Sequence, residues 1–284
     1  MYPAYQILGL QKLLRGLQGR SLPVIAGGGF FRVLDPRELA FPKEIRALEI
    51  ARGLLPFRPR IRWFALGSVA DIVRLRDKDL RLLQQSGCHR IEMGSESGSD
   101  PQLGRLGKRH RAGDILEATA RLRAHGIHST HNLIFGSLGE EPSDRRATFR
   151  LARKIGRIDP KAHLQFRLYQ VVPGTSHGDQ ALRSMPWFPK SLDQLATFRL
   201  GLAQGQRSLP WLSEEEEDLL HKLTDYVLPL AFHHPHPSKH PLVQTFFRRL
   251  ARARVRTGLQ LGLRWEERIY RKAIGEPLLT TYLP

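Results

Sequence analysis

The chain has 284 residues, 41% of them hydrophobic, which is enough for one large α/β domain with a smaller appendix. Its 45 Lys and Arg residues against 27 Asp and Glu give a formal net charge of +18, so the surface attracts polyanions and anionic membranes as a general field effect. The single cysteine excludes an internal disulfide, and no stretch approaches the roughly 18 apolar residues of a membrane span.

The first residues do not read as a secretory signal, because Lys12 and Arg15 interrupt their apolar positions. With one thiol in the chain, a reducing cytoplasm is the expected compartment. Cys88 cannot by itself hold an iron–sulfur cluster or a structural zinc ion, which need several thiolates or imidazoles.

Helices and strands alternate along the first two thirds of the chain. The helical spacing of apolar residues predicts helices over Tyr5–Leu17, Ile45–Leu55, Asp77–Gln85, Gly113–His125, and from a cap at Ser143 or Asp144 to Ile155. Short apolar runs predict strands over Leu22–Ala26, Arg60–Leu66, the first half of Gly87–Ser99, Ser129–Phe135 and His163–Val172.

This alternation predicts βα units and a parallel sheet. A ligand of such a sheet lies beyond the carboxyl ends of the strands. The turns expected along that rim are Gly27–Gly29, Gly67–Ser68, Gly94–Ser97, Gly136–Glu140 and Pro173–Thr175.

After about Gly178 the pattern changes to helices. Leu192–Gln204 reads as one helix. Ser213 with Glu216 predicts a capping box, and the acidic run Glu214–Asp218 suits the start of that helix; a metal or partner role is the alternative. His233–Pro241 reads as a proline-broken linker, with metal binding as the alternative. Phe246–Lys272 reads as one long basic helix packed on the domain, with adhesion to anionic lipid as the alternative.

Two carboxylates among the glycine-rich turns suggest chemistry. Glu96 can accept hydrogen bonds from ribose hydroxyls or an ammonium group, and Glu140 repeats the arrangement after Gly136 and Gly139. Each turn alone is weak evidence, because glycines after strands are more often turns than ligand sites. Together they favour a nucleotide-like ligand.

Several motifs of the chain resemble those of a known protein family. Six segments are similar, in order and spacing, to the second to sixth strand region of the radical SAM core. They are Ser86–Ser99, Leu106–Lys108, Ile115–Ala118, His125–Ile127, Leu133–Glu140 and Val172–Thr175. The resemblance covers roughly Leu22 to Asp179. The Arg-rich tail is similar to that of the cobalamin-dependent branch, whose members carry an N-terminal corrinoid-binding domain.

The resemblance implies an α/β fold: a partial (β/α) barrel of parallel strands over residues 1–180, without its first strand, and a helical extension over 181–284. It implies S-adenosylmethionine bound on a 4Fe-4S cluster and cleaved to a 5′-deoxyadenosyl radical. The positions that match cofactor-binding ones are Gly27, Gly28, Gly29 and Ser68 for the methionine part, Ser95, Glu96 and Ser97 for the ribose, and Gly136, Gly139 and Glu140 for the adenine.

The chain departs from the family at the cluster. The family uses three thiolates of a CxxxCxxC loop after the first strand, whereas this chain has one cysteine. Cys88 starts its strand, at the end of the barrel far from the site, so it is expected to be a small buried apolar residue. Tyr5–Leu17 occupies the place of the helix that follows the cluster loop in the family. Gly27–Phe31 stands where many members of the family carry acidic residues before Asn-Phe.

Three hypotheses follow. The first is a truncated radical SAM protein, of a family that carries out methyl transfer or C–H functionalisation, inactive as this chain alone; no catalytic or metal-binding residue is assigned. The second is a non-catalytic descendant that binds S-adenosylmethionine, another nucleotide or a partner. The third is a basic nucleic-acid or membrane-surface adaptor, although the sequence has no aromatic-interleaved basic ladder and no recognition-helix motif. The substrate stays unassigned.

Overall fold

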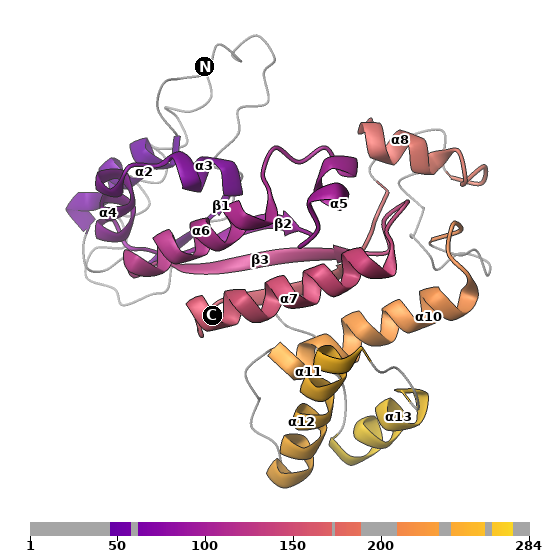
Figure 1. The fold of residues 1–284 in the computed structure, drawn as a ribbon. Coiled ribbons are helices and arrows are strands. Elements are labelled where there is room, and N and C mark those ends of the chain that lie inside the picture. The colour runs from indigo at the N-terminus through magenta and orange to yellow at the C-terminus, as the bar shows by residue number, and fades with distance from the viewer. Residues whose placement is uncertain are drawn as a thin grey trace. The chain divides into compact units, whose positions relative to one another are not determined.

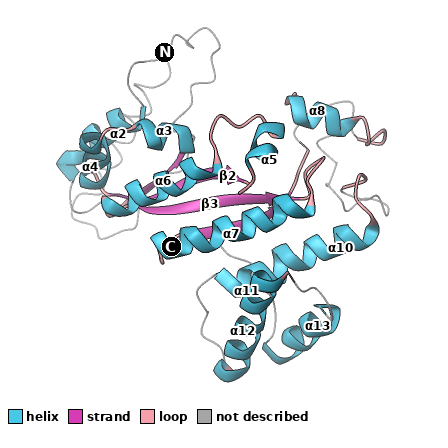
Figure 2. Cartoon of the chain, in the orientation of Figure 1, coloured by secondary structure: helices cyan, strands magenta, loops and turns pink. Residues whose placement is uncertain are grey.

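The computed structural model describes residues 46–57, 62–171, 174–188, 209–232, 240–258 and 263–274. Helices and strands alternate along the first part of these residues, and only helices follow the last strand (Figures 1 and 2). The expected elements Tyr5–Leu17, Leu22–Ala26 and Leu192–Gln204, and nearly all of the His-rich linker, lie outside the described residues.

The sheet has four parallel strands in the order β1-β2-β3-β4. They are β1 (Trp63–Gly67), β2 (Cys88–Glu96), β3 (His128–Phe135) and β4 (His163–Leu168). Sequential order with a helix between successive strands is the arrangement of repeated βα units, so the predicted parallel α/β fold is confirmed. β4 ends earlier than expected, although the Tyr169 N–H still donates to the Phe135 carbonyl over 2.8 Å.

A bulge near the start of β2 sets which side chains are buried. Trp63 pairs with Cys88 and Phe64 pairs with Arg90, so His89 is an extra residue in the ladder. Strict alternation would place Cys88 and Ile91 on opposite faces of the sheet. The bulge lets both be buried, and it starts the alternation that buries Met93 and Ser95.

The predicted helices form close to their expected bounds. They are α2 (Arg46–Leu54), followed by the 3₁₀ turn η1 (Leu55–Phe57), α4 (Asp77–Gln85), α6 (Ala112–Ala124) and α7 (Pro142–Ile158). Helix α7 begins before Ser143, and the Asp144 carboxylate in its first turn accepts the Glu141 N–H over 3.0 Å. The predicted start of the helix at Ser143 or Asp144 is therefore wrong, and Asp144 instead accepts the backbone N–H of the residue that precedes the helix.

Three short helices were not expected: α3 (Val69–Arg74), α5 (Asp100–Arg105) and α8 (Ser176–Leu182). Each follows a Ser or Thr whose side chain accepts an N–H from the residue three positions on, namely Ser68, Ser99 and Thr175. These N-caps are visible in the sequence. The helices are too short to show a clear apolar period, which is why periodicity missed them.

The chain divides into two compact units that interleave along the sequence. The first holds the described residues up to Ser95, with 113–131 and 154–163. The second holds 96–112, 132–153 and the described residues from Leu164 onward. Ile72, Leu80 and Ile91 are fully buried in the first unit, and Phe135 and Leu220 in the second. The predicted boundary at residue 180 stays a prediction.

The second unit contains the C-terminal helices. They are α10 (Glu214–Lys222), the π-helical turn η2 (Leu223–Val227), α11 (Leu228–Phe232), α12 (Pro241–Thr257) and α13 (Leu263–Ile274). The capping box of Ser213 and Glu216 is confirmed at the start of α10. Among the described helices, none combines the length and the apolar character that crossing a bilayer requires.

The prediction of one helix from Phe246 to Lys272 is wrong. Helix α12 ends at Gly258, whose φ of 74° is left-handed and whose N–H donates to the Arg254 carbonyl over 2.7 Å. A left-handed glycine after the last turn is a common helix stop. The basic segment is therefore two helices rather than one.

Candidate functional site

Glu96, the last residue of β2, has the most unusual backbone and side chain in the second unit. Among the described residues it alone has a positive φ without being glycine, at 60°. The residue is 8% exposed, and its Oε1 accepts a hydrogen bond from Lys108 Nζ over 2.7 Å. Its other carboxylate oxygen, Oε2, is buried without a hydrogen-bond partner. A strained backbone under a buried, half-satisfied carboxylate is typical of a functional position.

The turn after Glu96 is held against helix α7. The Gly98 N–H donates to Thr148 Oγ1 over 2.9 Å, and the Ser97 hydroxyl lies 3.1 Å from the same oxygen. A Cβ at Gly98 would lie 2.5 Å from the Ala147 carbonyl oxygen, so only glycine fits there without movement. This contact presses the turn onto the helix and keeps Glu96 at the strand end.

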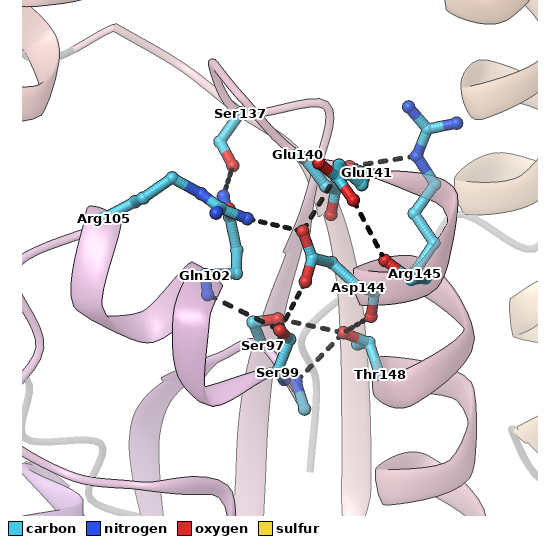
Figure 3. Close-up of polar contacts among 12 residues, drawn as sticks. Ser97, Ser99, Gln102, Arg105, Ser137, Glu140, Glu141, Asp144, Arg145 and Thr148 are labelled. Carbon is cyan, nitrogen blue, oxygen red and sulfur yellow. Dashed lines mark hydrogen bonds and ion pairs between the residues drawn. The ribbon is translucent and has the colours of Figure 1, made fainter.

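Asp144 connects the same turn to helices α5 and α7 (Figure 3). The residue is 6% exposed, its Oδ1 accepts from the Ser99 hydroxyl, and its Oδ2 accepts from Arg105 Nη2 over 2.5 Å and from the Glu141 N–H over 3.0 Å. Arg105 Nε also donates to Gln102 Oε1 over 2.6 Å. Lys108, the partner of Glu96, follows α5, so Asp144 orients the segment that leads to it.

Glu140 closes the turn that follows β3. Its Oε2 accepts from the Gly136 N–H over 2.6 Å and from Arg145 Nε over 3.2 Å. Gly136 has a φ of 79°, and the Gln102 amide donates to the hydroxyl of Ser137 beside it, which links this turn to α5. Oε2 of Glu140 is thus engaged by its own turn and by α7, while Oε1 is buried without a hydrogen-bond partner.

Burial raises the pKa of Glu140 to about 7, although the Gly136 N–H and Arg145 both favour the anion. A carboxyl with a higher pKa in the folded protein binds more protons there, so its stabilising contribution is present below pH 4.5 and is lost as the pH rises to about 7. The size of that loss is about 3 kcal/mol. We expect the Glu140→Gln variant to lack this pH dependence of the free energy of unfolding. Urea unfolding of the wild type and the variant between pH 4.5 and 7 measures it, and the same pH dependence in both proteins would contradict the prediction.

An aromatic group covers the turn after β3. Trp211 Nε1 donates to the Gly136 carbonyl over 3.0 Å. The Trp211 ring meets Tyr169 edge-on at 6.0 Å, and Tyr169 meets His177 in the same way at 5.3 Å. Burial lowers the pKa of His177. These side chains come from segments after β4, so they complete the surroundings of the turn from the C-terminal half of the chain.

Residues 17–152 match the sequence model of the radical SAM superfamily. This chain contains a radical SAM domain. The match includes the Glu96 turn, the Gly136–Glu140 turn and most of α7.

Two relatives illustrate the likeness. The tRNA-2-methylthio-N(6)-dimethylallyladenosine synthase of Chlorobium phaeovibrioides is 36% identical over 70 residues, which are 24% of this chain and 16% of that protein. The cobalamin-dependent S-adenosylmethionine radical enzyme OxsB, solved with aqua-cobalamin and S-adenosylmethionine bound, superposes with a TM-score of 0.58 at 13% identity. The superposition covers 97% of this chain and 47% of OxsB, so the chain spans less than half the length of either relative.

The radical SAM domain brings some of the predicted binding residues together and leaves others apart. Glu96, Ser97, Gly136, Gly139 and Glu140 belong to the second unit. Of these, Ser97 and Glu140 are labelled among the polar contacts in Figure 3. Gly139 has a φ of 76° and lies against the Arg105 side chain. Gly27, Gly28 and Gly29 lie outside the described residues.

Ser68 and Ser95 belong to the first unit. The Ser68 hydroxyl caps α3, where it accepts the Asp71 N–H over 3.1 Å and donates to the Asp71 carboxylate over 2.6 Å. Ser95 Oγ lies 2.7 Å from Nδ1 of His131, whose burial lowers its pKa to about 3. Both hydroxyls therefore have local structural partners.

Sequence reasoning missed Lys108, Gln102, Arg105, Asp144 and Thr148. Lys108 stood inside a quoted motif, and Asp144 was expected only to cap a helix. Nothing in the sequence indicates that Ser99 and Asp144, 45 positions apart, share a hydrogen bond.

Cys88 has the predicted structural role. It is 2% exposed at the start of β2, and burial raises the pKa of its thiol to about 12. A neutral, buried thiol is a poor metal ligand. Among the described residues, no three His, Cys, Asp or Glu side chains are grouped so as to hold a metal ion.

Proposed function

We propose that this radical SAM domain binds S-adenosylmethionine beside Glu96, at the carboxyl end of β2. The observation that carries the proposal is the buried Oε2 of Glu96, which has no partner although the backbone is strained to place it there. Such strain costs about 1 to 3 kcal/mol and persists where the position is needed. The cytoplasm remains the expected compartment.

S-adenosylmethionine fits the charges of this site. The ligand carries an ammonium group, a sulfonium and two ribose hydroxyls, all of which suit a carboxylate acceptor. It also carries a carboxylate, which suits a cation such as Lys108 Nζ. When bound on an iron–sulfur cluster, the cofactor supplies a 5′-deoxyadenosyl radical. The residues of this chain would bind and orient it: Glu96 accepts, Lys108 balances the charge, and the turn around Gly98 keeps both in place.

The cluster does not fit the residues of this chain. A 4Fe-4S cluster that leaves one iron open for the cofactor needs three protein thiolates, and these 284 residues contain one cysteine, which is buried and neutral. We therefore derive no radical step from this chain. Methyl transfer and C–H functionalisation stay implications of the family, and aqua-cobalamin is a ligand of OxsB rather than of this chain.

Replacing Glu96 tests the binding proposal. We expect Glu96→Gly to weaken S-adenosylmethionine binding by roughly tenfold to a hundredfold, since a charge-assisted hydrogen bond contributes about 1.5 to 3 kcal/mol. The same change removes the left-handed strain and also the ion pair with Lys108, two opposing effects of similar size, so the variant should unfold at a urea concentration close to that of the wild type. Isothermal titration calorimetry and urea unfolding measure the two effects.

Glu117→Ala, at an exposed carboxylate of α6, is the matched control and should leave affinity unchanged. Equal affinity of the wild type and Glu96→Gly would remove the site, and no heat with either would remove the proposed ligand. A loss of both affinity and stability would assign Glu96 a structural role instead.

Cluster assembly is a separate prediction. Reconstituted anaerobically with iron and sulfide, the 284-residue polypeptide should show no stoichiometric four-iron signal by EPR or absorption, because it offers one thiol. Cys88→Ser serves as the control for adventitious iron. A stoichiometric signal that Cys88→Ser lacks would overturn the prediction.

The second candidate function is binding without catalysis. The observation that favours it is the same lone, neutral Cys88. Titration with S-adenosylhomocysteine and adenosine beside S-adenosylmethionine separates the two. Equal affinity for all three would favour a general nucleoside-binding role, whereas preference for the sulfonium would favour the radical SAM cofactor.

A further inference from the structure

Helices α12 and α13 contact each other in the second unit (Figure 1). Phe247 of α12 meets Tyr270 of α13 with ring centroids 5.4 Å apart. Glu266 is buried between Tyr226, whose hydroxyl donates over 3.0 Å, and Arg254, whose Nε donates over 2.6 Å. These contacts fix which side of each helix faces the rest of the second unit.

Each of the two helices also exposes a pair of large apolar residues one helical turn apart. Leu242 and Phe246 of α12 are 85% and 61% exposed, and Trp265 and Ile269 of α13 are 68% and 56% exposed. Elsewhere in the described residues the only comparable side chains are Leu66, at 41%, and Val243 beside Leu242, at 36%. Single exposed apolar residues are normal, but a concentration of this kind marks an interaction surface.

The same helices are strongly cationic. Residues 241–274 contain nine Lys and Arg and two acidic residues. Both acidic residues are engaged, Glu266 with Arg254 and Glu267 with Arg271 over 2.7 Å. Arg249, Arg252 and Arg256 are exposed on α12. The Arg268 guanidinium lies 5.4 Å from the centre of the Trp265 ring, so an apolar ring and a cation share one place on the surface.

We propose that the α12–α13 pair docks on an anionic phospholipid bilayer. Lipid headgroups match the uncompensated arginines, and the boundary between headgroups and acyl chains accommodates Leu242, Phe246, Trp265 and Ile269. Tryptophan and arginine suit that boundary because each combines an apolar body with a polar end. Nucleic acid would satisfy the charges but would leave Leu242 and Ile269 in water. This inference is independent of the cofactor proposal.

Vesicle binding tests it with the full chain. Sedimentation should show binding to phosphatidylcholine vesicles that contain phosphatidylglycerol and little binding to phosphatidylcholine alone. The double change Phe246→Ser with Trp265→Ser should weaken binding about tenfold or more, as each removes apolar burial. Arg249→Gln should weaken it about fivefold, the effect of one cation near an anionic surface. All three positions are exposed, so circular dichroism should show unchanged folding.

Leu66→Ser, at the exposed apolar residue of β1, is the matched control and should bind vesicles as the wild type does. Four results would overturn the proposal: equal binding to neutral vesicles, no effect of the serine changes, tighter binding to duplex DNA that the serine changes leave intact, and dimerisation through these residues by light scattering. Loss of vesicle binding in the serine and arginine variants alone would support it.

Discussion

Asp144→Ala should destabilise the protein by about 3 kcal/mol, because it leaves Arg105, the Ser99 hydroxyl and the Glu141 N–H without their shared acceptor. The Arg105 side chain is 37% exposed, so water recovers part of the loss and the estimate lies at the lower end for a broken buried pair. The variant should also weaken S-adenosylmethionine binding, since α5 leads to Lys108. Urea unfolding and calorimetry measure both effects.

Two further variants separate charge from shape. Asp144→Asn keeps one acceptor oxygen and the size of the side chain, so its loss of stability should be smaller than that of alanine. Asp77→Ala removes a surface carboxylate that pairs with Arg121 over 3.3 Å and is 63% exposed, and it should cost less than about 1 kcal/mol. If Asp144→Ala cost no more than Asp77→Ala, the network in Figure 3 would not stabilise the site.

Gly98→Ala should also destabilise the protein, by about 3 kcal/mol. The added Cβ would lie 2.5 Å from the Ala147 carbonyl oxygen and 2.8 Å from Thr148 Cα, and these backbone atoms of α7 cannot turn aside as a side chain would. The turn must then move off the helix, which lengthens the hydrogen bond from the Gly98 N–H to Thr148. We expect weaker cofactor binding as well, since Glu96 is two residues away.

Gly104→Ala is the control for Gly98→Ala. Gly104 lies within α5, and a Cβ there would meet nothing within 4 Å. Because alanine favours a helix more than glycine does, this variant should be more stable by about 0.5 to 1 kcal/mol. If both alanine variants changed the stability in the same direction, the close approach of backbone atoms would not be the reason why Gly98 is needed.

Much of the fold could be predicted from the local pattern. Asp77–Gln85 forms a helix with the expected bounds, and Ser213 and Glu216 form the expected capping box, because both depend on residues within one or two helical turns. Gly258 shows the limit of this reasoning. The long period of apolar residues suggested one helix, while a single glycine in the left-handed region stopped it.

The sequence by itself determined the order of helices and parallel strands, and hence that Glu96 and Glu140 follow neighbouring strands. Only the tertiary structure decided how the two carboxylates differ. One oxygen of each carboxylate is buried without a hydrogen-bond partner. The other oxygen of Glu140 accepts from Gly136 and Arg145, within five positions of it, whereas that of Glu96 accepts from Lys108, 12 positions away, and of the two only Glu96 has a left-handed backbone. The physical reason is distance along the chain. A local apolar period shows which side of a helix or strand is buried, but not which distant residues that side will contact. The hydrogen bond between Ser99 and Asp144 joins residues 45 positions apart and forms only when the elements pack.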